Sequence, residues 1–360
     1  MLKIGIITFH RAINYGAVLQ TYALSKYLIE LGYDVQVLNY RCKAIEDSYK
    51  VNISFNMYSF KRLLLSPLSL NKKRKFYRFL NNKIPHTKSL YTYNDLCEAA
   101  KDFDFIITGS DQVWNSQWTH GDEAYLLNFC NDEKKLSYAA SIGKNNISDK
   151  EKELFEKHLQ KFKGISVREQ TGKDLLSSFV QSEISVNCDP VALLDKDLWT
   201  KITNRPKQKN YVLVYMLVNS KSLMNAAIEY GKKTGKEVIL INDNIRKNYP
   251  VTYKRNVSPE EFVGLFCDAD CVFTNSFHGT MFSIIFEKEL HIELQKYSGA
   301  PNSRFTDLLK KLEIENCIFD TLVSDDCINK IDYVSVKERI KEMQNETRIY
   351  FDTAFLKGNK

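Results

Sequence analysis

The sequence predicts an α/β protein of two domains, each built on a parallel sheet covered by helices. Strand-like and helix-like segments alternate from the first residues, and the alternation restarts after a polar run at 204–210. The chain has 360 residues, which exceeds the size at which one hydrophobic core stops growing. We therefore expect an N-terminal domain at 1–203, a C-terminal domain at 204–335, and a C-terminal helix and tail at 336–360 that pack across both.

The first domain opens with the apolar segment 3–9, which predicts a strand. Apolar residues at helical spacing over 17–31 predict a helix, which Gly32 ends as a C-cap. Further strands are expected at 34–40, 103–108, 136–140, 164–167 and 184–187, and a charged amphipathic helix at 150–163. Several of these strands are followed by small or polar residues, as at the ligand-binding edge of an open α/β sheet.

The second domain repeats the pattern, with strands expected at 211–217, 237–241 and 271–274 and helices at 222–233 and 258–267. Ser258, Pro259 and Glu261 form a strong helix start. After strand 271–274 come a polar turn and then His278, at the start of an apolar helix. We expect this histidine to face a site, because ligands bind where strands end and helix N-termini point outward, and we expect the bare Gly279 to let a ligand approach closely.

Composition predicts a globular cytoplasmic protein. Hydrophobic residues make up 44% and charged residues 26% of the chain, and no uninterrupted apolar run is long enough to span a bilayer. The N-terminus lacks a secretion signal, and the eight cysteines show no CxxC pair. Cys267 and Cys271 are four residues apart, but no second ligand pair follows, so ordinary burial is expected for them rather than metal binding.

The formal net charge of +7 suits anionic ligands, acidic lipid surfaces or nucleic acid, and charge alone does not choose among them. Much of it lies in a basic, partly apolar insertion at 56–82. Two interpretations are open: the insertion lies on an anionic membrane surface, or its apolar side packs on the domain, with Pro67 interrupting the helix. Nucleic-acid binding is not expected, because no recognised binding motif accompanies the charge.

Common cofactor signatures are missing. The loop 8–16 lacks the three-glycine spacing of dinucleotide-binding turns, and no Walker lysine loop occurs. HExxH and GxSxG motifs are also absent. Dinucleotide and nucleoside-triphosphate chemistry is therefore disfavoured.

Polar residues at the predicted strand ends remain as candidates. An arginine after a buried strand often pairs with a carboxylate, and a lone histidine there is more often structural than functional. Asp111 could cap the following turn, and Gly16 could serve backbone geometry alone. The candidates are Asn14, Tyr15, Gly16, Ser110, Asp111, Gln112, Arg168, Asp189, Asn275, Ser276, His278, Gly279, Thr280 and Arg304.

Five segments in order resemble one family. They are ITFHRAINYGAVLQTYAL at 7–24, GSDQVWN at 109–115, SVREQTG at 166–172, CDPVALL at 188–194 and TNSFHGTMFSIIF at 274–286. Together they are similar to the polysaccharide pyruvyl transferase family, over residues 2 to about 312. The insertion 56–82 and the C-terminal tail have no counterpart in this resemblance.

The resemblance implies a GT-B-like fold, in which two Rossmann-like doubly wound domains face a cleft. It implies transfer of the pyruvyl group of phosphoenolpyruvate onto two hydroxyls of a saccharide, giving a cyclic ketal and phosphate, without a metal or other cofactor. The acceptor is expected to be a lipid-linked or nucleotide-linked saccharide at the inner face of the plasma membrane, in exopolysaccharide or capsule biosynthesis. Two alternatives stay open: a nucleotide-sugar-dependent GT-B glycosyltransferase, and a non-catalytic binding module.

The resemblance also suggests roles for the candidates. Guanidinium groups bind carboxylates and phosphates in pairs, so Arg168 and Arg304 are candidates for holding the donor. Protonation of the donor methylene needs a general acid, for which histidine is best suited, so His278 is assigned as the acid or as a phosphate contact. Asp111 is the candidate for accepting a sugar hydroxyl proton. Other candidates are assigned to substrate binding, with the first domain on the acceptor side and the second on the donor side: Asn14, Tyr15, Gly16, Ser110, Gln112, Asn275, Ser276, Gly279 and Thr280.

Overall fold

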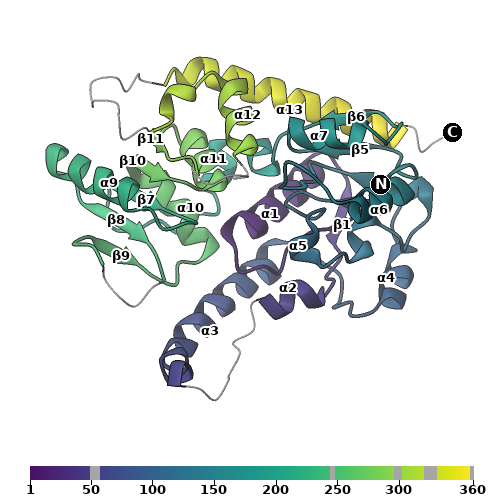
Figure 1. Ribbon diagram of the computed structural model, residues 1–360, viewed down its shortest axis with the longest axis horizontal. Helices are drawn as coiled ribbons and strands as arrows, with labels where there is room; N and C mark the ends of the chain where they lie inside the picture. The colour runs from purple at the N-terminus through teal and green to yellow at the C-terminus, as the bar shows by residue number, and fades with distance from the viewer. Residues whose placement is uncertain (49–56, 244–247, 296–301, 320–330, 357–360) are drawn as a thin grey trace. The chain divides into compact units, whose positions relative to one another are not determined.

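The computed structural model (Figure 1) describes residues 1–48, 57–243, 248–295, 302–319 and 331–356. The chain divides into two compact units. Unit 1 comprises 1–50, 80–193 and 340–360, and unit 2 comprises 51–79 and 194–339. Each unit contains a parallel sheet with helices, as the alternation predicts.

Unit 1 contains a four-stranded sheet in the order β2-β1-β3-β4. Its strands are β1 (Lys3–Ile7), β2 (Asp34–Val37), β3 (Phe105–Thr108) and β4 (Lys135–Ser137). All pair in parallel, and a parallel pair of β5 (Ile165–Val167) and β6 (Ile184–Val186) continues beside β4 through isolated bridges. Burial on both faces makes β1 and β3 almost continuously apolar.

The helices of unit 1 connect these strands. They are α1 (Tyr15–Glu30), α2 (Lys43–Ser48), α4 (Tyr93–Ala100), α5 (Ser116–Thr119), α6 (Asp149–Leu159) and α7 (Gln170–Ser177), with 3₁₀ turns η1 (Glu123–Leu126), η2 (Asp132–Lys134) and η3 (Pro190–Leu193). Capping boxes begin α4 at Thr92 and α6 at Ser148. Each box satisfies two backbone N–H groups that a helix start leaves open.

Unit 2 contains a five-stranded parallel sheet in the order β11-β10-β7-β8-β9. The strands are β7 (Tyr211–Tyr215), β8 (Val238–Ile241), β9 (Thr252–Lys254), β10 (Ala269–Thr274) and β11 (Glu289–Ile292). The helices are α8 (Lys196–Thr200), α9 (Lys221–Thr234), α10 (Pro259–Asp268), α11 (Phe277–Ile285) and α12 (Ser303–Leu312), with the 3₁₀ turn η4 (Glu315–Cys317). The helix start predicted at Ser258, Pro259 and Glu261 is confirmed as a capping box.

Two long helices contribute residues to both units: α3 (Met57–Lys83) and α13 (Tyr333–Leu356). In unit 1 the end of α13 packs on the sheet, where Tyr350 Oη donates to the Ser137 carbonyl at 2.5 Å and the Phe351 ring stacks on Tyr138 at 4.9 Å. This contact explains why 340–360 belongs to unit 1.

The unit boundaries differ from those expected from the sequence. Residues 194–203 belong to unit 2, because Trp199 on α8 is completely buried and its ring meets Phe282 of α11 at 4.9 Å. The polar run 204–210 is therefore a surface connection within unit 2 and no interdomain linker. Most of the insertion also groups with unit 2 instead of the N-terminal domain.

The second half of the insertion is held by ion pairs within unit 2. Lys72 Nζ lies 2.6 Å from Asp243 Oδ2, and Lys75 Nζ lies 2.8 Å from Glu261 Oε2. These pairs support the packing interpretation for this half of α3, while residues 49–56 and the side chains of 57–69 lie outside the described part of the chain. Membrane contact by 56–82 stays a prediction. Among the described residues, no helix combines the length and apolar character needed to cross a bilayer.

Candidate active site

The loop after β3 in unit 1 places three predicted residues. Asp111 is a non-glycine residue with a left-handed backbone, φ 72°, which is an uncommon conformation that surrounding contacts must hold. Here the Asp111 carbonyl accepts the Ser141 N–H at 2.9 Å, and its Oδ1 accepts the Gln112 N–H at 2.8 Å. The alternative that Asp111 caps its own turn is thus realised, and its side chain keeps partial solvent exposure.

The side chains of Ser110 and Gln112, on either side of Asp111, form hydrogen bonds within unit 1. Ser110 is completely buried and its Oγ donates to the Ala139 carbonyl at 3.0 Å. Gln112 Oε1 accepts Asn115 Nδ2 at 2.8 Å and Trp118 Nε1 at 3.0 Å. Both side chains fix the loop, and their predicted substrate contacts stay predictions.

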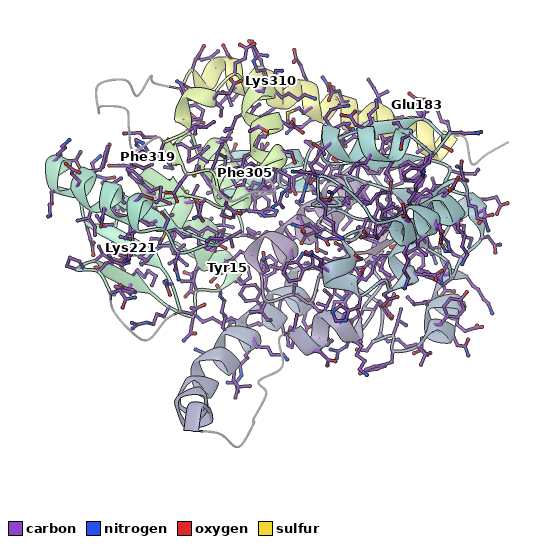
Figure 2. The ribbon with its side chains drawn as sticks, viewed as in Figure 1. Tyr15, Glu183, Lys221, Phe305, Lys310 and Phe319 are labelled. Carbon is purple, nitrogen blue, oxygen red and sulfur yellow. The ribbon has the colours of Figure 1, made fainter. Side chains whose placement is uncertain are left out.

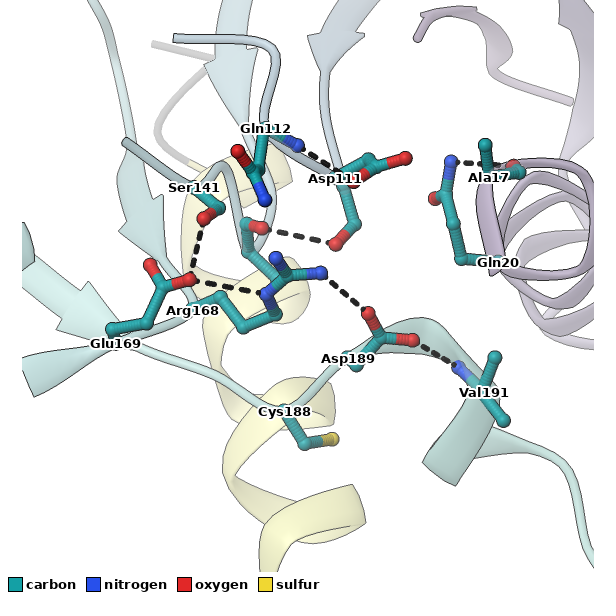
Figure 3. A network of polar contacts seen from close by, with 12 residues as sticks. Ala17, Gln20, Asp111, Gln112, Ser141, Arg168, Glu169, Cys188, Asp189 and Val191 are labelled. Carbon is teal, nitrogen blue, oxygen red and sulfur yellow. Dashed lines mark hydrogen bonds and ion pairs between the residues drawn. The ribbon is translucent and has the colours of Figure 1, made fainter. Parts of the chain in front are cut away.

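Arg168 lies at the end of β5 among carboxylates (Figure 3). Its Nη1 donates to Asp189 Oδ2 at 2.8 Å and its Nε to Glu169 Oε1 at 3.3 Å. The side chains of all three residues are at most 4% exposed. Glu169 also accepts the Ser141 hydroxyl, and Asp189 Oδ1 accepts the Val191 N–H at 3.0 Å.

Electrostatics explains how this charge stays buried. Burial alone would lower the pKa of Arg168, but Glu169, Asp189 and Asp111 outweigh it and raise that pKa above its ordinary value. One guanidinium between two carboxylates gives a local excess of negative charge, which does not favour an incoming anion. The geometry thus supports a carboxylate-paired arginine, and direct donor binding by Arg168 stays an untested prediction.

Helix α1 begins at Tyr15, two residues earlier than expected, and so includes the end of the predicted loop 8–16. Asn14 is the exposed N-cap, and its Oδ1 accepts the Ala17 N–H at 3.3 Å. Tyr15 and Gly16 are already helical and buried. Only Asn14 of the three is therefore exposed to solvent in this unit.

Gln20 was missed by sequence reasoning. It is completely buried on α1, with Nε2 donating to Thr8 Oγ1 and to the Ala17 carbonyl, both at 2.9 Å (Figure 3). Its Oε1 has no hydrogen-bond partner among the residues the structure describes. A glutamine inside a helical pattern carries no sequence signal for such a position.

In unit 2 the residues after β10 organise the carboxyl edge of the sheet. Asn275 is buried; its Oδ1 accepts the Leu217 N–H at 2.9 Å and its Nδ2 donates to the Val218 carbonyl at 2.7 Å. Ser276 is the N-cap of α11, with Oγ accepting the Gly279 N–H at 3.3 Å. These contacts fix the loop after β7 and the start of α11 relative to each other.

Gly279 is needed for packing, which corrects the expectation that it leaves room for a ligand. A Cβ there would lie 2.5 Å from Thr274 Oγ1 and 3.2 Å from Tyr215 Cδ1. Thr274 cannot withdraw easily, because its hydroxyl donates to the Tyr215 carbonyl at 2.7 Å. The adjacent Thr280 is also completely buried, and its Oγ1 finds no partner within the described parts of the chain.

His278 and Arg304 flank the same aromatic ring. The half-buried His278 imidazole meets the Phe277 ring edge-on at 5.4 Å, and Arg304 Cζ lies 5.9 Å from the centre of that ring. The Phe277 ring packs in turn against the ring of Phe305 on α12 (labelled in Figure 2), with the ring centres 6.0 Å apart. The predicted proton donor and one predicted guanidinium thus both contact Phe277 in unit 2, whereas Arg168 and Asp111 belong to unit 1.

A cavity of about 280 Å³ lies at the carboxyl ends of β7 and β8 in unit 2, where Tyr253 of β9 and the residues before that strand also line it. Tyr249 and Tyr253 provide aromatic walls, and asparagine amides and Lys221 provide polar groups. Small-molecule sites commonly combine such walls with a few polar groups. No local sequence pattern indicates this cavity, because the residues that line it come from separate segments between 216 and 253.

Comparison with known proteins gives a family and a fold. A family model described as polysaccharide pyruvyl transferase matches residues 14–291. A search of curated proteins gives no significant match.

Solved structures show distant similarity. A protein described as a UDP-N-acetylglucosamine 2-epimerase of Listeria monocytogenes has a TM-score of 0.52 at 10% identity, covering 96% of this chain and 91% of its own. The UDP-GlcNAc 2-epimerase of Methanocaldococcus jannaschii has a TM-score of 0.49 at 12% identity, covering 96% and 93%. MurG of Acinetobacter baumannii has a TM-score of 0.42 at 9% identity, covering 97% of both chains. The predicted fold class, GT-B-like with two Rossmann-like units, is confirmed.

Proposed function

Because this chain belongs to the polysaccharide pyruvyl transferase family, we propose that it transfers the pyruvyl group of phosphoenolpyruvate onto two hydroxyls of a saccharide, forming a ketal. The observation that carries this proposal is that His278 and Arg304 both lie within 6 Å of the Phe277 ring, at the carboxyl edge of the unit 2 sheet. A proton donor and a guanidinium near one ring suit a small substrate that must be both bound as an anion and protonated.

The chemistry balances as an addition followed by a substitution. A proton adds to the methylene carbon of the donor while one sugar hydroxyl bonds to its second carbon and loses its own proton. The second hydroxyl then replaces the phosphate at that carbon, and its proton leaves with the phosphate. The products are a cyclic ketal and inorganic phosphate, so the reaction needs no oxidant or reductant.

His278 is assigned the first proton transfer, because histidine titrates closest to neutral pH among the side chains. Arg304 is assigned the donor carboxylate or phosphate, since its planar donors match such groups in pairs. Arg304 lies in the first turn of α12, next to the buried core residue Phe305. The helix therefore fixes the backbone position from which the Arg304 side chain extends.

In unit 1, Asp111 is assigned the removal of a sugar hydroxyl proton. Its carboxylate is partly exposed and held by a well-anchored loop. Arg168 supports this site by its charge, which acts on Asp111, and is a positioning residue in this proposal. The exposed Asn14 is a further candidate for a sugar contact.

The acceptor is proposed to be a lipid-linked or nucleotide-linked saccharide, used at the inner face of the plasma membrane for cell-surface polysaccharide. Basic residues of α3 support membrane attachment. Arg74 and Arg78 are exposed and one helical turn apart, and such cations are attracted to anionic lipid.

The decisive test is phosphate release from phosphoenolpyruvate with a lipid-linked or nucleotide-linked saccharide present, followed by mass analysis of the sugar. The expected product gains a pyruvyl ketal, and His278→Ala loses phosphate release while keeping its melting temperature. Phosphate release without any change in sugar mass would contradict the proposal.

A nucleotide-sugar glycosyltransferase is the second candidate, and the cavity beside β7, β8 and β9 favours it because Tyr249 and Tyr253 can stack on a planar base. Thermal stabilisation distinguishes the two. A ligand at 100 times its dissociation constant adds about 2.7 kcal/mol to native stability. Phosphoenolpyruvate should stabilise the protein in the first case and a uridine diphosphate sugar in the second.

A further inference from the structure

Three potential metal ligands meet on two neighbouring strands of unit 2. Cys271 on β10 and Glu289 on β11 are partners in the parallel register, and His291 lies two residues beyond Glu289. Side chains two residues apart share one face of a sheet, so all three point the same way. Their ligand atoms lie within 4.8 Å of one another.

Contacts with neighbouring aromatic rings hold these ligands in place. The His291 ring stacks on Phe273 at 4.2 Å with an interplanar angle of 8°, and its Nε2 lies 3.1 Å from Glu289 Oε1. Tyr230 on α9 donates from Oη to Glu289 Oε2 at 2.6 Å. The imidazole nitrogen therefore already faces the carboxylate that would share a metal with it.

Burial gives the cluster a closed side and an open side. Cys271 is completely buried and His291 is 3% exposed, whereas the Glu289 side chain is 41% exposed and leaves access for an ion. The nearby Lys236 is paired with Asp270 at 2.8 Å, so its charge is balanced. The surroundings can therefore accept a cation.

The donor set selects the metal. Thiolate and imidazole ligands suit Zn²⁺, while Mg²⁺ and Ca²⁺ prefer all-oxygen sites. Zinc bonds of about 2.0–2.3 Å require the three donors to draw slightly inward, and a solvent molecule can supply the fourth position.

We propose that Cys271, Glu289 and His291 bind one Zn²⁺ ion, with Tyr230 as the hydrogen-bond partner of the carboxylate ligand. Cys271 lies in the first half of β10 and Glu289 is the first residue of β11, whereas His278 follows the carboxyl end of β10. The ion therefore fastens the edge strand β11 to β10 and takes no part in the transfer reaction.

The test uses the purified full chain under reducing conditions, titrated with Co²⁺ as a spectroscopic probe and with Zn²⁺ as competitor. We expect one Co²⁺ per chain, a thiolate-to-cobalt charge-transfer band in the near ultraviolet, and loss of the band on adding Zn²⁺. Zn²⁺ should also raise the melting temperature of the wild type. Cys271→Ser and His291→Gln should lose the band.

Matched variants separate the site from other cysteines. Cys267→Ser, four residues earlier on α10, should keep the band in full. Tyr230→Phe should keep the band with affinity weakened roughly 10- to 100-fold, as for loss of an outer hydrogen-bond partner. Glu289→Gln changes a partly exposed side chain, so it keeps the fold and should weaken binding.

Two outcomes would overturn the proposal. One is a wild type that gives no charge-transfer band and no Zn²⁺-dependent rise in melting temperature. The other is a band that survives in a folded Cys271→Ser chain, which would place the metal on another cysteine. Neither outcome depends on transferase activity.

Discussion

Arg168 Nη1 donates to Asp189 Oδ2 at 2.8 Å, and the two side chains are 2% and 0% exposed. Removing one partner of a buried ion pair lowers the stability of the protein far more than removing one partner of a surface pair, because the remaining charge is left buried. Unit 1 therefore depends on this pair for stability as well as for the electrostatics of its carboxyl edge.

Removing Asp189 should unfold the protein more easily. We expect Asp189→Ala to lower the free energy of unfolding by about 3–5 kcal/mol, measured by urea denaturation. Glu98 and Lys101 provide the control, since their side chains are 71% and 67% exposed and Glu98→Ala should cost less than about 1 kcal/mol. Equal effects of the two variants would show that the buried pair contributes no more than a surface pair.

Replacing His278 should damage turnover and spare the fold. A general acid contributes about 10²–10⁴ to the rate, so His278→Gln should lower phosphate release by that factor. The exposed His120 supplies the control: it has a left-handed backbone, φ 53°, which asparagine tolerates, and His120→Asn should retain full activity. Full turnover in folded His278→Gln protein would exclude the acid role.

Replacing Arg304 should weaken binding of the donor more than binding of the acceptor. A charge-assisted hydrogen bond contributes about 1.5–3 kcal/mol, so Arg304→Ala should weaken phosphoenolpyruvate binding roughly 10- to 150-fold, measured by calorimetry. Arg304→Lys keeps the charge and loses the planar fork, and should recover only part of the affinity. Arg348→Ala removes a largely exposed cation paired loosely with Asp352 at 3.8 Å and should change nothing.

Gly279→Ala should destabilise unit 2. The new Cβ would lie 2.5 Å from Thr274 Oγ1, and overpacking of this kind costs about 1–3 kcal/mol. Gly172→Ala on α7 is the opposite case, because the nearest atom to its Cβ would be 3.7 Å away. There alanine should stabilise the protein by about 0.5–1 kcal/mol, as measured by denaturation of both variants.

Acid should remove a stabilising contribution of Glu151. Burial alone would raise the pKa of this carboxyl, but hydrogen bonds from Lys144, Ser116 and Ser148 outweigh it and lower that pKa to about 2. A carboxyl whose pKa is lower in the folded state stabilises the protein above its unfolded pKa of about 4.3. This contribution disappears as the pH falls toward about 2.

Glu151→Gln should therefore lose stability relative to wild type at pH 7, with the difference shrinking below pH 4. Denaturation curves at both ends of this range measure the change. Glu156→Gln, on the exposed face of the same helix, should show no such pH dependence. A Glu151→Gln deficit that stays constant down to pH 2.5 would rule out this linkage.

The sequence predicted the sheets well because burial on both faces leaves continuous apolar strands, as in 211–217 and 271–274. It missed β9 and β11, which have only three and four residues. These are the two edge strands of the unit 2 sheet, and each pairs with one longer neighbour, β8 or β10. It also missed α4, although Thr92 and Asp95 form a capping box that the spacing could have revealed.

The site was harder to predict for a different reason. The sequence singles out His278 because it follows a strand end, and its role in the site stays a prediction. The structural duty of Asn275 depends on Leu217 and Val218, nearly sixty residues earlier in the chain. Likewise, no local pattern shows that Thr274 occupies the space beside Gly279. Contacts between segments that are distant in the sequence decide such roles. The periodicity of apolar residues indicates only the local secondary structure.

The assignment of 340–360 to unit 1 affects how the protein is made. Tyr350 and Phe351 contact Ser137 and Tyr138, so unit 1 cannot be completed until the segment that follows unit 2 in the chain has been synthesised. The strands of unit 2 are all synthesised earlier. The unit that contains the first residues of the chain thus makes its last contacts with residues synthesised after every strand of unit 2.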